Sequence, residues 1–206
     1  MTAVRVSCLM PTRARHVLLP TAVANFLAQE FSNTELLIVS EDGVPDSIAP
    51  ALASGRVRHI PCPPSLSLGA KRNFACQAAQ GELLAHWDDD DWYARDRLRR
   101  QVQALLAKPG KALCGSSRVY FRDLSGERAW EYRYQGNRQP WLCGATLLYR
   151  REFWLAHPFP DRSIGEDNHF VWSADAAEVI DLADSALCIA SVHAGNSSRK
   201  DTASAW

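Results

Sequence analysis

The chain has 206 residues, 47% of them hydrophobic, and its 23 basic and 23 acidic side chains leave no net formal charge. This size suits one ordinary domain with a buried core, and the composition excludes a disordered chain. A nucleic-acid partner is not expected, because proteins that bind nucleic acids are usually more basic.

Signals for a membrane span or for export are missing from the sequence. The N-terminus has no charged-then-apolar pattern, and no apolar run approaches the ~20 residues that cross a bilayer. The six cysteines are scattered, form no Cys-x-x-Cys pair and lie among apolar or small residues, as reduced and buried thiols do. We therefore expect a soluble, cytoplasmic protein that associates at most peripherally with the inner face of a membrane.

The first predicted unit is a strand, a helix and a second strand. Strands are predicted at Val4–Met10 and Glu35–Val39, which are short and almost continuously apolar, and a helix over residues 18–31, where apolar side chains recur at helical spacing. Such a unit implies parallel strands joined by a right-handed crossover.

Polar residues follow each of these two strands. The first strand leads into Pro11, Thr12 and Arg13, and the second into Glu41 and Asp42. Because ligands of open α/β sheets bind outside the carboxyl ends of the strands, both segments are expected beside a ligand.

A basic helix continues the pattern. A third strand is predicted at Val57–Ile60, a helix from Leu68 to the glycine that closes it, Gly81, and a further strand at Glu82–Trp87. The helix carries Lys71 and Arg72 in its first turn, where the helix dipole disfavours cations. These two side chains therefore indicate an anionic ligand.

Four consecutive aspartates, Asp88 to Asp91, follow the strand that ends at Trp87. Like charges this close disfavour joint ionisation unless a cation compensates them. Magnesium or manganese is normally held by one or two carboxylates together with the oxygens of a diphosphate. The run therefore predicts a divalent-metal site completed by a nucleotide, rather than a solvated acidic turn.

The second half of the chain mixes helices and strands without internal repeats. The expected elements are a basic amphipathic helix at Arg95–Leu106, strands or a hairpin within 111–134, a strand at Trp141–Arg150, a short helix at Phe153–Ala156, a helical stretch over 168–177, a strand at 179–180 and a polar tail after Val192. Trp130, Trp141, Trp154 and Trp172 offer aromatic faces on which a sugar ring could stack, although tryptophan is as often part of a core.

Six segments, in this order, resemble the motifs of family 2 of the inverting glycosyltransferases. They are Met10–Thr12, Leu37–Gly43, Leu68–Asn73 with Ala79–Glu82, Trp87–Trp92, Gly165–Asp167 and Val192–Ser197. Each is weak alone, but their order and spacing along nearly the whole chain are specific.

The resemblance implies an α/β protein of the GT-A type. It would be a single Rossmann-like domain, residues 1–206, with a central, mostly parallel mixed sheet flanked by helices. Residues 1–95 would form the half that binds the nucleotide sugar, and residues 96–206 the half that binds the acceptor and supplies the catalytic base.

The resemblance also implies which residues bind the donor. They would be Pro11, Thr12, Arg13, Glu41, Asp42, Lys71, Arg72, Asp88 and Asp89. The usual Asp-Asp-Gly of the family is Glu41-Asp42-Gly43 here, which leaves open which carboxylate meets the base. Arg72 would contact the base or the diphosphate.

Metal and catalytic roles follow from the same resemblance. The Asp-x-Asp pattern maps to Asp88 and Asp90, with Asp90 the direct ligand of manganese or magnesium and Asp88 also near the ribose. His193 resembles a histidine that completes the metal or diphosphate site in some relatives, and it is taken here as a third metal ligand. Asp167 would be the general base that faces the acceptor hydroxyl, with Glu166 the next candidate.

The sequence thus predicts a metal-dependent inverting glycosyltransferase that moves a sugar from a nucleoside-diphosphate sugar, UDP-linked in the commonest case, to a hydroxyl of a glycan or glycolipid. A nucleotidyltransferase on a related fold is disfavoured because residues 11–14 contain no glycine. A non-catalytic sugar-nucleotide or carbohydrate-binding module stays open, and Asp167 argues against it. The donor sugar, the acceptor and the oligomeric state cannot be predicted from the sequence.

Overall fold

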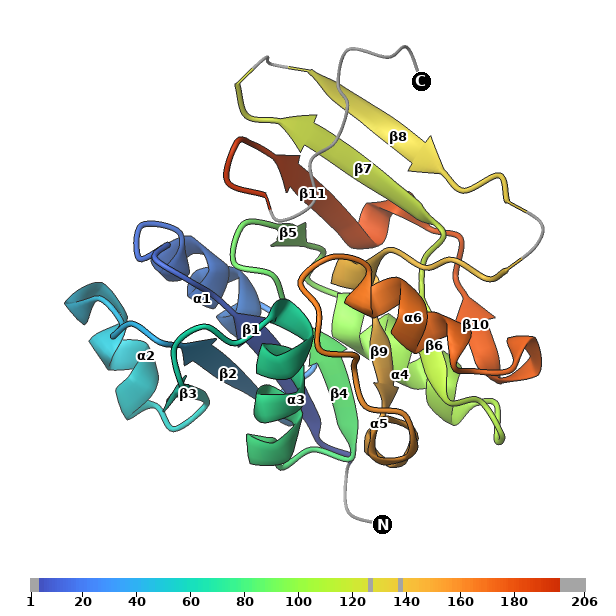
Figure 1. Cartoon of the computed structure of the whole chain (residues 1–206), viewed down its shortest axis with the longest axis horizontal. Coiled ribbons are helices and arrows are strands. Elements are labelled where there is room, and N and C mark those ends of the chain that lie inside the picture. Colours follow the sequence, from blue (N-terminus) through green and yellow to red (C-terminus); the bar gives the residue numbers. More distant parts are fainter. Residues whose placement is uncertain (1–3, 126–127, 137–138, 197–206) are drawn as a thin grey trace.

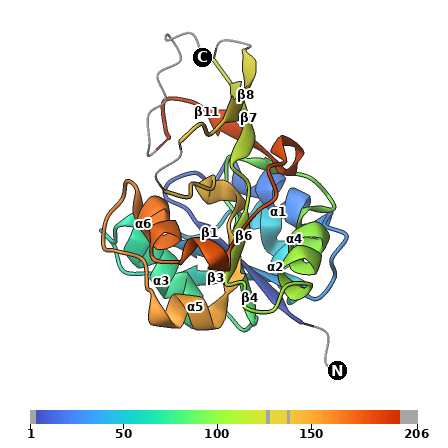
Figure 2. The same ribbon diagram turned by 90° about the vertical axis from the view of Figure 1, so that its right-hand side faces the viewer.

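Two β-sheets organise the protein in a computed structural model that describes residues 4–125, 128–136 and 139–196. The larger sheet has seven strands in the order β10-β6-β9-β4-β1-β2-β3, and the smaller sheet has four in the order β5-β11-β7-β8. Figure 1 shows the smaller sheet beyond the ends of the central strands of the larger one, and Figure 2 shows it projecting from the body of the molecule.

The larger sheet is mostly parallel. Its strands are β1 (Val6–Pro11), β2 (Thr34–Ser40), β3 (Val57–Pro61), β4 (Leu83–His86), β6 (Leu113–Gly115), β9 (Leu148–Arg150) and β10 (Val179–Asp181). β9 runs antiparallel to both of its neighbours, β4 and β6. Every residue of β1, β2 and β4 is buried, as expected for strands with both faces covered.

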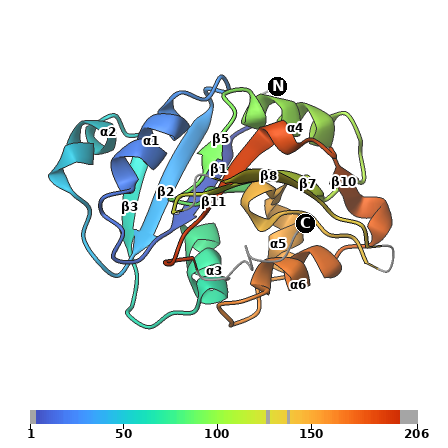
Figure 3. The same ribbon diagram turned by 90° about the horizontal axis from the view of Figure 1, so that it is seen from above.

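Helices cover both faces of this sheet. They are α1 (Leu19–Leu27), α2 (Ala49–Ala53), α3 (Leu68–Ala78), α4 (Arg97–Leu106), α5 (Arg151–Ala156) and α6 (Glu166–Trp172), with short 3₁₀ turns at Asp46–Ile48, Gly144–Thr146, Ala176–Glu178 and Ser185–Leu187. Figure 3 shows α1, α2 and α4 on one face and α3, α5 and α6 on the other. Across the described ranges, no helix combines the length and apolar character that a membrane crossing requires.

The smaller sheet joins segments that are far apart in the sequence. Its strands are β5 (Trp92–Tyr93), β7 (Arg118–Asp123), β8 (Ala129–Arg133) and β11 (Cys188–Val192). β11 pairs in parallel with β7 and antiparallel with β5. The hairpin of β7 and β8 agrees with the strands expected within 111–134, whereas β5 and β11 were not predicted. This sheet brings the end of the acidic run beside the segment that leads into His193.

Two predicted elements differ from the structure. α3 ends at Ala78 and is not closed by Gly81. A Cβ atom at Gly81 would lie 2.7 Å from the backbone nitrogen of Ser7, so this glycine allows the start of β4 to approach β1. The strand expected from Trp141 shrinks to β9 because residues 144–146 form a 3₁₀ turn. The α/β class and the central, mostly parallel mixed sheet are confirmed.

Candidate active site

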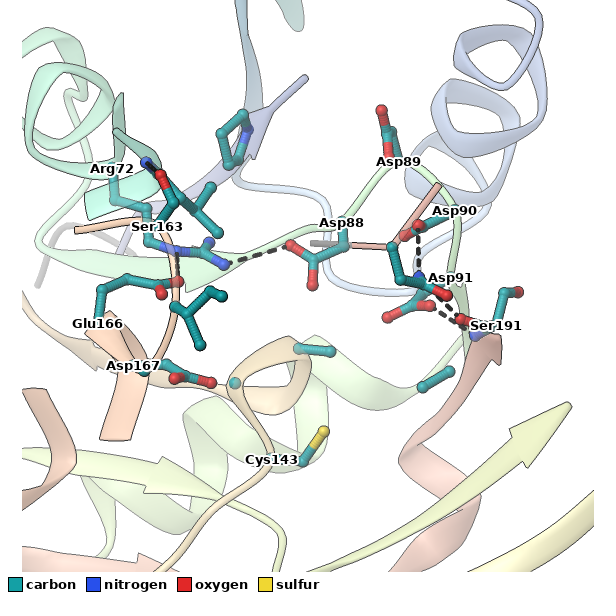
Figure 4. Close-up of a pocket in the computed structure, with 18 of the residues that line it drawn as sticks. Arg72, Asp88, Asp89, Asp90, Asp91, Cys143, Ser163, Glu166, Asp167 and Ser191 are labelled. Atoms are coloured by element: carbon teal, nitrogen blue, oxygen red, sulfur yellow. Dashed lines mark hydrogen bonds and ion pairs between the residues drawn. The ribbon is translucent and has the colours of Figure 1, made fainter. Parts of the chain in front are cut away.

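A cavity of about 290 Å³ lies where β1 and β4 end. Seven of the predicted site residues line it, namely Pro11, Arg72, Asp88, Asp89, Asp90, Glu166 and Asp167. Figure 4 shows the acidic run on one side of the cavity and Asp167 across from Asp90 on the other. The first, third and fourth motifs of the resemblance thus meet the fifth in one cavity, whereas no residue of the second motif lines it.

The acidic turn after β4 is fixed by aromatic packing and by two strands. Trp87 is fully buried, and its ring centroid lies 4.3 Å from that of Tyr93. The Asp88 backbone N–H donates to the Tyr93 hydroxyl at 2.8 Å. At the other end of the turn, the backbone N–H of Ser191 in β11 donates to the Asp91 carboxylate at 2.8 Å. The smaller sheet therefore helps to place the carboxylates.

Arg15 neutralises part of this run. Its Nη1 lies 2.8 Å from Asp89 Oδ1 and 2.9 Å from Asp90 Oδ2, and its Nη2 donates to the carbonyl oxygen of Gly195. The Thr12 hydroxyl also donates to the Asp89 carboxylate. Arg15 was not among the predicted site residues. A cation in the loop after the first strand was visible in the sequence, but its partners lie far along the chain.

The acidic run still carries uncompensated charge. Burial, followed by the charges of the neighbouring aspartates, raises the pKa of Asp90, although Arg15 acts in the opposite direction. Burial and the same neighbours raise the pKa of Asp91 well above its ordinary value. A further cation would favour the ionised form of both groups.

The donor atoms around Asp90 fit a hard divalent cation. His193 Nε2 lies 3.0 Å from Asp90 Oδ2, and the Asn196 side-chain amide donates to the same oxygen at 3.3 Å. Carboxylate oxygens suit magnesium or manganese, and an imidazole nitrogen is a common metal ligand. Within the described ranges, no group of three or more His, Cys, Asp or Glu side chains is arranged as a metal site.

Arg72 links the acidic run to the start of α6. The residue is 3% exposed, its Nε lies 3.2 Å from Glu166 Oε1, and its Nη2 lies 3.6 Å from Asp88 Oδ1. Burial opposes the charge of Arg72, but the carboxylates of Asp88, Glu166 and Asp167 outweigh it and raise the pKa of the guanidinium. Protein carboxylates therefore supply much of the anionic partner predicted for this cation. Its buried Nη1 has no hydrogen-bond partner among the residues described.

Asp167 lies at the first turn of α6, half-buried in the cavity wall. The backbone N–H of Asn168 donates to its Oδ1 at 2.8 Å. A Cβ atom at Gly144 would collide with the Asp167 carboxylate, so the glycine of the 3₁₀ turn makes room for it. The His86 ring lies behind this turn, with its Nδ1 2.8 Å from the Gly144 carbonyl oxygen.

The remaining predicted donor residues form a network beside the cavity. The Lys71 ammonium lies 2.6 Å from Glu41 Oε2 and donates to the Thr12 carbonyl oxygen at 3.0 Å. Arg13 forms an ion pair with Glu41 on the outer side. The backbone N–H of Ala14 donates to the Asp42 carboxylate at 2.9 Å. This network ties the ends of β1 and β2 to α3.

Comparisons with known proteins identify the family. A model described as glycosyl transferase family 2 matches residues 7–171. The UDP-Glc:alpha-D-GlcNAc-diphosphoundecaprenol beta-1,3-glucosyltransferase WfgD of Escherichia coli is 21% identical over 173 residues, which cover 81% of this chain and 68% of that protein. An uncharacterized glycosyltransferase of Haemophilus influenzae is 27% identical over 106 residues, 49% of this chain and 42% of its own length.

Solved structures share the fold. TarS 1-349 of S. aureus, in complex with UDP-GlcNAc, has a TM-score of 0.70 at 15% identity, over 93% of this chain and 60% of that one. The mannosyltransferase PcManGT from Pyrobaculum calidifontis, in complex with GDP-Man and Mn2+, has a TM-score of 0.70 at 18% identity, over 95% of this chain and 59% of that one. The present chain thus spans about 60% of the TarS structure.

The chain belongs to glycosyl transferase family 2 and has the GT-A fold. Both expectations drawn from the six motifs are confirmed. Val192 and Asn196 of the sixth motif line the cavity, and Ser197 lies outside the described residues.

Proposed function

We propose that this chain is a metal-assisted, inverting glycosyltransferase whose donor is a nucleoside-diphosphate sugar, UDP-linked, and whose acceptor is a hydroxyl of a glycan or glycolipid. One observation carries the proposal: a single cavity joins the acidic run, two arginines and the carboxylate of Asp167. Support for the donor comes from the solved relatives, whose complexes contain UDP-GlcNAc or GDP-Man with Mn2+.

The donor would bind at the acidic end of the cavity. Asp90, Asp88 and His193 would hold the divalent ion, which neutralises the charge of the departing diphosphate when bound. Arg72 would add a second positive charge there, because its buried Nη1 has no hydrogen-bond partner among the described residues. Pro11, Thr12, Arg13, Glu41, Asp42, Lys71 and Asp89 would hold or position the nucleoside.

Asp167 would act as the general base. An inverting transfer needs a carboxylate on the side of the anomeric carbon opposite the leaving group, and Asp167 lies across the cavity from Asp90 (Figure 4). Glu166 is 3% exposed and paired with Arg72, which suits a positioning role better than proton transfer. Residues 1–95 would thus bind the donor and residues 96–206 would supply the base.

The acceptor class and the location are supported by one relative. WfgD is named for a diphosphoundecaprenol-linked acceptor, which is a lipid-linked sugar. A similar acceptor would bring this chain to the inner face of a cytoplasmic membrane by peripheral contact.

Hydrolysis of candidate donors tests the proposal. UDP-glucose, UDP-GlcNAc and GDP-mannose are incubated with the protein, with manganese or with a chelator, and proton NMR follows the released sugar. We expect the protein to hydrolyse at least one donor when manganese is present and none when the chelator is present. From an α-linked UDP-sugar, the β-anomer should be released first. Release of the α-anomer from such a donor would refute inversion. Binding of nucleotide without hydrolysis, and without transfer to any acceptor, would indicate a non-catalytic module.

A further inference from the structure

The four tryptophans singled out in the sequence have different environments. Trp154 is 6% exposed and donates from Nε1 to the Asn73 side chain at 2.9 Å. Trp130 packs on Phe121, with ring centroids 5.6 Å apart. Trp172 is exposed on α6, whereas Trp141 lines the same cavity as Asp167. Trp141 is therefore the one of the four placed beside the proposed base.

The Trp141 indole is held in one orientation. Tyr134 stacks on it with a centroid distance of 5.5 Å and an interplanar angle of 29°, and Tyr132 meets it edge-on at 5.2 Å and 72°. The Trp172 Nε1–H donates to the carbonyl oxygen of Pro140 at 3.1 Å. Because Trp172 belongs to α6, this bond ties the backbone beside Trp141 to the helix that carries Asp167.

A strip of aromatic rings continues from the cavity onto the smaller sheet. We call it the aromatic strip, and its members are Phe121, Trp130, Tyr132, Tyr134 and Trp141. Phe121 also lines the cavity, and its ring lies 6.2 Å from that of Tyr132. Phe121 pairs across the strands with Trp130, and Tyr132 lies two residues further along β8, so these three share one face of the hairpin of β7 and β8. The hairpin projects from the body of the molecule (Figures 1 and 2).

We infer that the acceptor is a saccharide whose pyranose ring stacks on Trp141 at the aromatic end of the cavity, an inference that rests on the proposed function. One face of a pyranose presents C–H groups, which pack on the electron-rich face of an indole. Hydroxyl groups project from the rim of the ring, so stacking directs one of them toward Asp167. Phe121 adds a second aromatic ring to the cavity wall. Tyr132 and Tyr134 hold the Trp141 indole in place before the sugar binds, which lowers the entropic cost of binding.

Saturation-transfer NMR tests the inference with methyl glycosides of glucose, galactose, mannose and N-acetylglucosamine, in the presence of UDP and magnesium. The variants are Trp141→Ala, Trp141→Phe and the matched control Tyr120→Ala. Tyr120 is 41% exposed and precedes Phe121 in β7, so its side chain points to the opposite face of the sheet.

We expect at least one glycoside to bind the parent protein, with its affinity lowered roughly tenfold to a hundredfold by Trp141→Ala. Trp141→Phe should recover part of the affinity and Tyr120→Ala should match the parent. Calorimetry should show unchanged UDP binding in all three variants, which also verifies that they fold. Equal glycoside binding by Trp141→Ala and the parent would overturn the inference.

The parent also separates this inference from the proposed function. UDP binding without any glycoside binding would refute the stacking site alone. Failure of the parent to bind any nucleotide diphosphate would refute the proposed function, and the acceptor site with it.

Discussion

The two ends of the cavity are built from different interactions. At the acidic end, Arg15 and Arg72 balance carboxylates that are partly or fully buried. At the aromatic end, ring packing holds Trp141, and the Trp172 side chain of α6 donates a hydrogen bond to the carbonyl oxygen of the neighbouring Pro140. A bound cation or anion can replace one partner of an ion pair, whereas packed rings keep their positions with or without a ligand. We therefore expect ligands to reorganise the acidic end and to leave the aromatic end unchanged.

Asp167 lies between the two ends, and its neutralisation should have the largest effect. Asp167→Asn keeps the size of the side chain and removes the base, so transfer should fall by about 10²–10⁴-fold. UDP binding in calorimetry should not change, because the acidic end stays intact. Glu166→Gln is the comparison. It should weaken UDP binding, because Glu166 pairs with Arg72 and holds that guanidinium in place. A near-parental transfer rate in Asp167→Asn would move the base elsewhere.

At the acidic end, replacement of Asp90 should have the largest effect on metal-dependent UDP binding. Asp90→Asn should weaken UDP binding in the presence of manganese at least about tenfold, since even changes to residues behind metal ligands cost that much. Glycoside binding at the aromatic end should persist. Asp46→Asn, an exposed aspartate in the 3₁₀ turn before α2, provides a control with the same charge change. Manganese-dependent UDP binding that survives Asp90→Asn would contradict the proposed metal site.

The sequence predicted the acidic end better than the aromatic one, for a physical reason. β1, β2 and β4 are mostly apolar because helices cover both of their faces, and the four aspartates follow the last of them after one residue, Trp87. β5 and β11 are two and five residues long, and they pair only because the rest of the fold brings them together. Local sequence patterns therefore do not predict such long-range strand pairing.

The same limit applies to single residues. Arg15 meets Asp89 and Asp90, more than seventy positions away, so no spacing rule could connect them. Trp141 and Trp154 look alike in the sequence, and only their burial and partners separate a cavity residue from a core residue.

Arg15 should compete with the metal ion. Without nucleotide, Arg15→Ala should bind manganese about fivefold more tightly, which corresponds to roughly 1 kcal/mol, a size typical of a partly exposed ion pair. The metal-free variant should also melt earlier than the parent, because the buried carboxylates lose their counter-charge. Titration of manganese followed by electron paramagnetic resonance measures the affinity. Arg13→Ala is the control, because Arg13 pairs with Glu41 beside the cavity. Equal manganese affinity in Arg15→Ala and the parent would show that the guanidinium does not occupy the place of the ion.

The smallest effect concerns pH and Glu166. Burial, supported by the charge of Asp167 and opposed by Arg72, raises the pKa of Glu166. The folded protein therefore holds this proton more tightly than the unfolded chain does. The resulting stabilisation is fully present below the unfolded pKa, about 4.3, and is lost as the pH rises through the folded pKa.

Glu166→Gln should remove this dependence, because glutamine resembles the protonated acid and does not titrate. Urea unfolding of the metal-free protein between pH 4 and pH 7 measures it: the free energy of unfolding of Glu166→Gln, relative to the parent, should rise with pH over this window. Glu152→Gln, at an exposed position on α5, is the control. The pH dependence of its free energy of unfolding should be closer to that of the parent. Parallel curves for Glu166→Gln and the parent would mean that Arg72 fully compensates the buried carboxylate. The acidic end would then be balanced before any ligand binds, and the contrast with the aromatic end would rest on Asp90 and Arg15 alone.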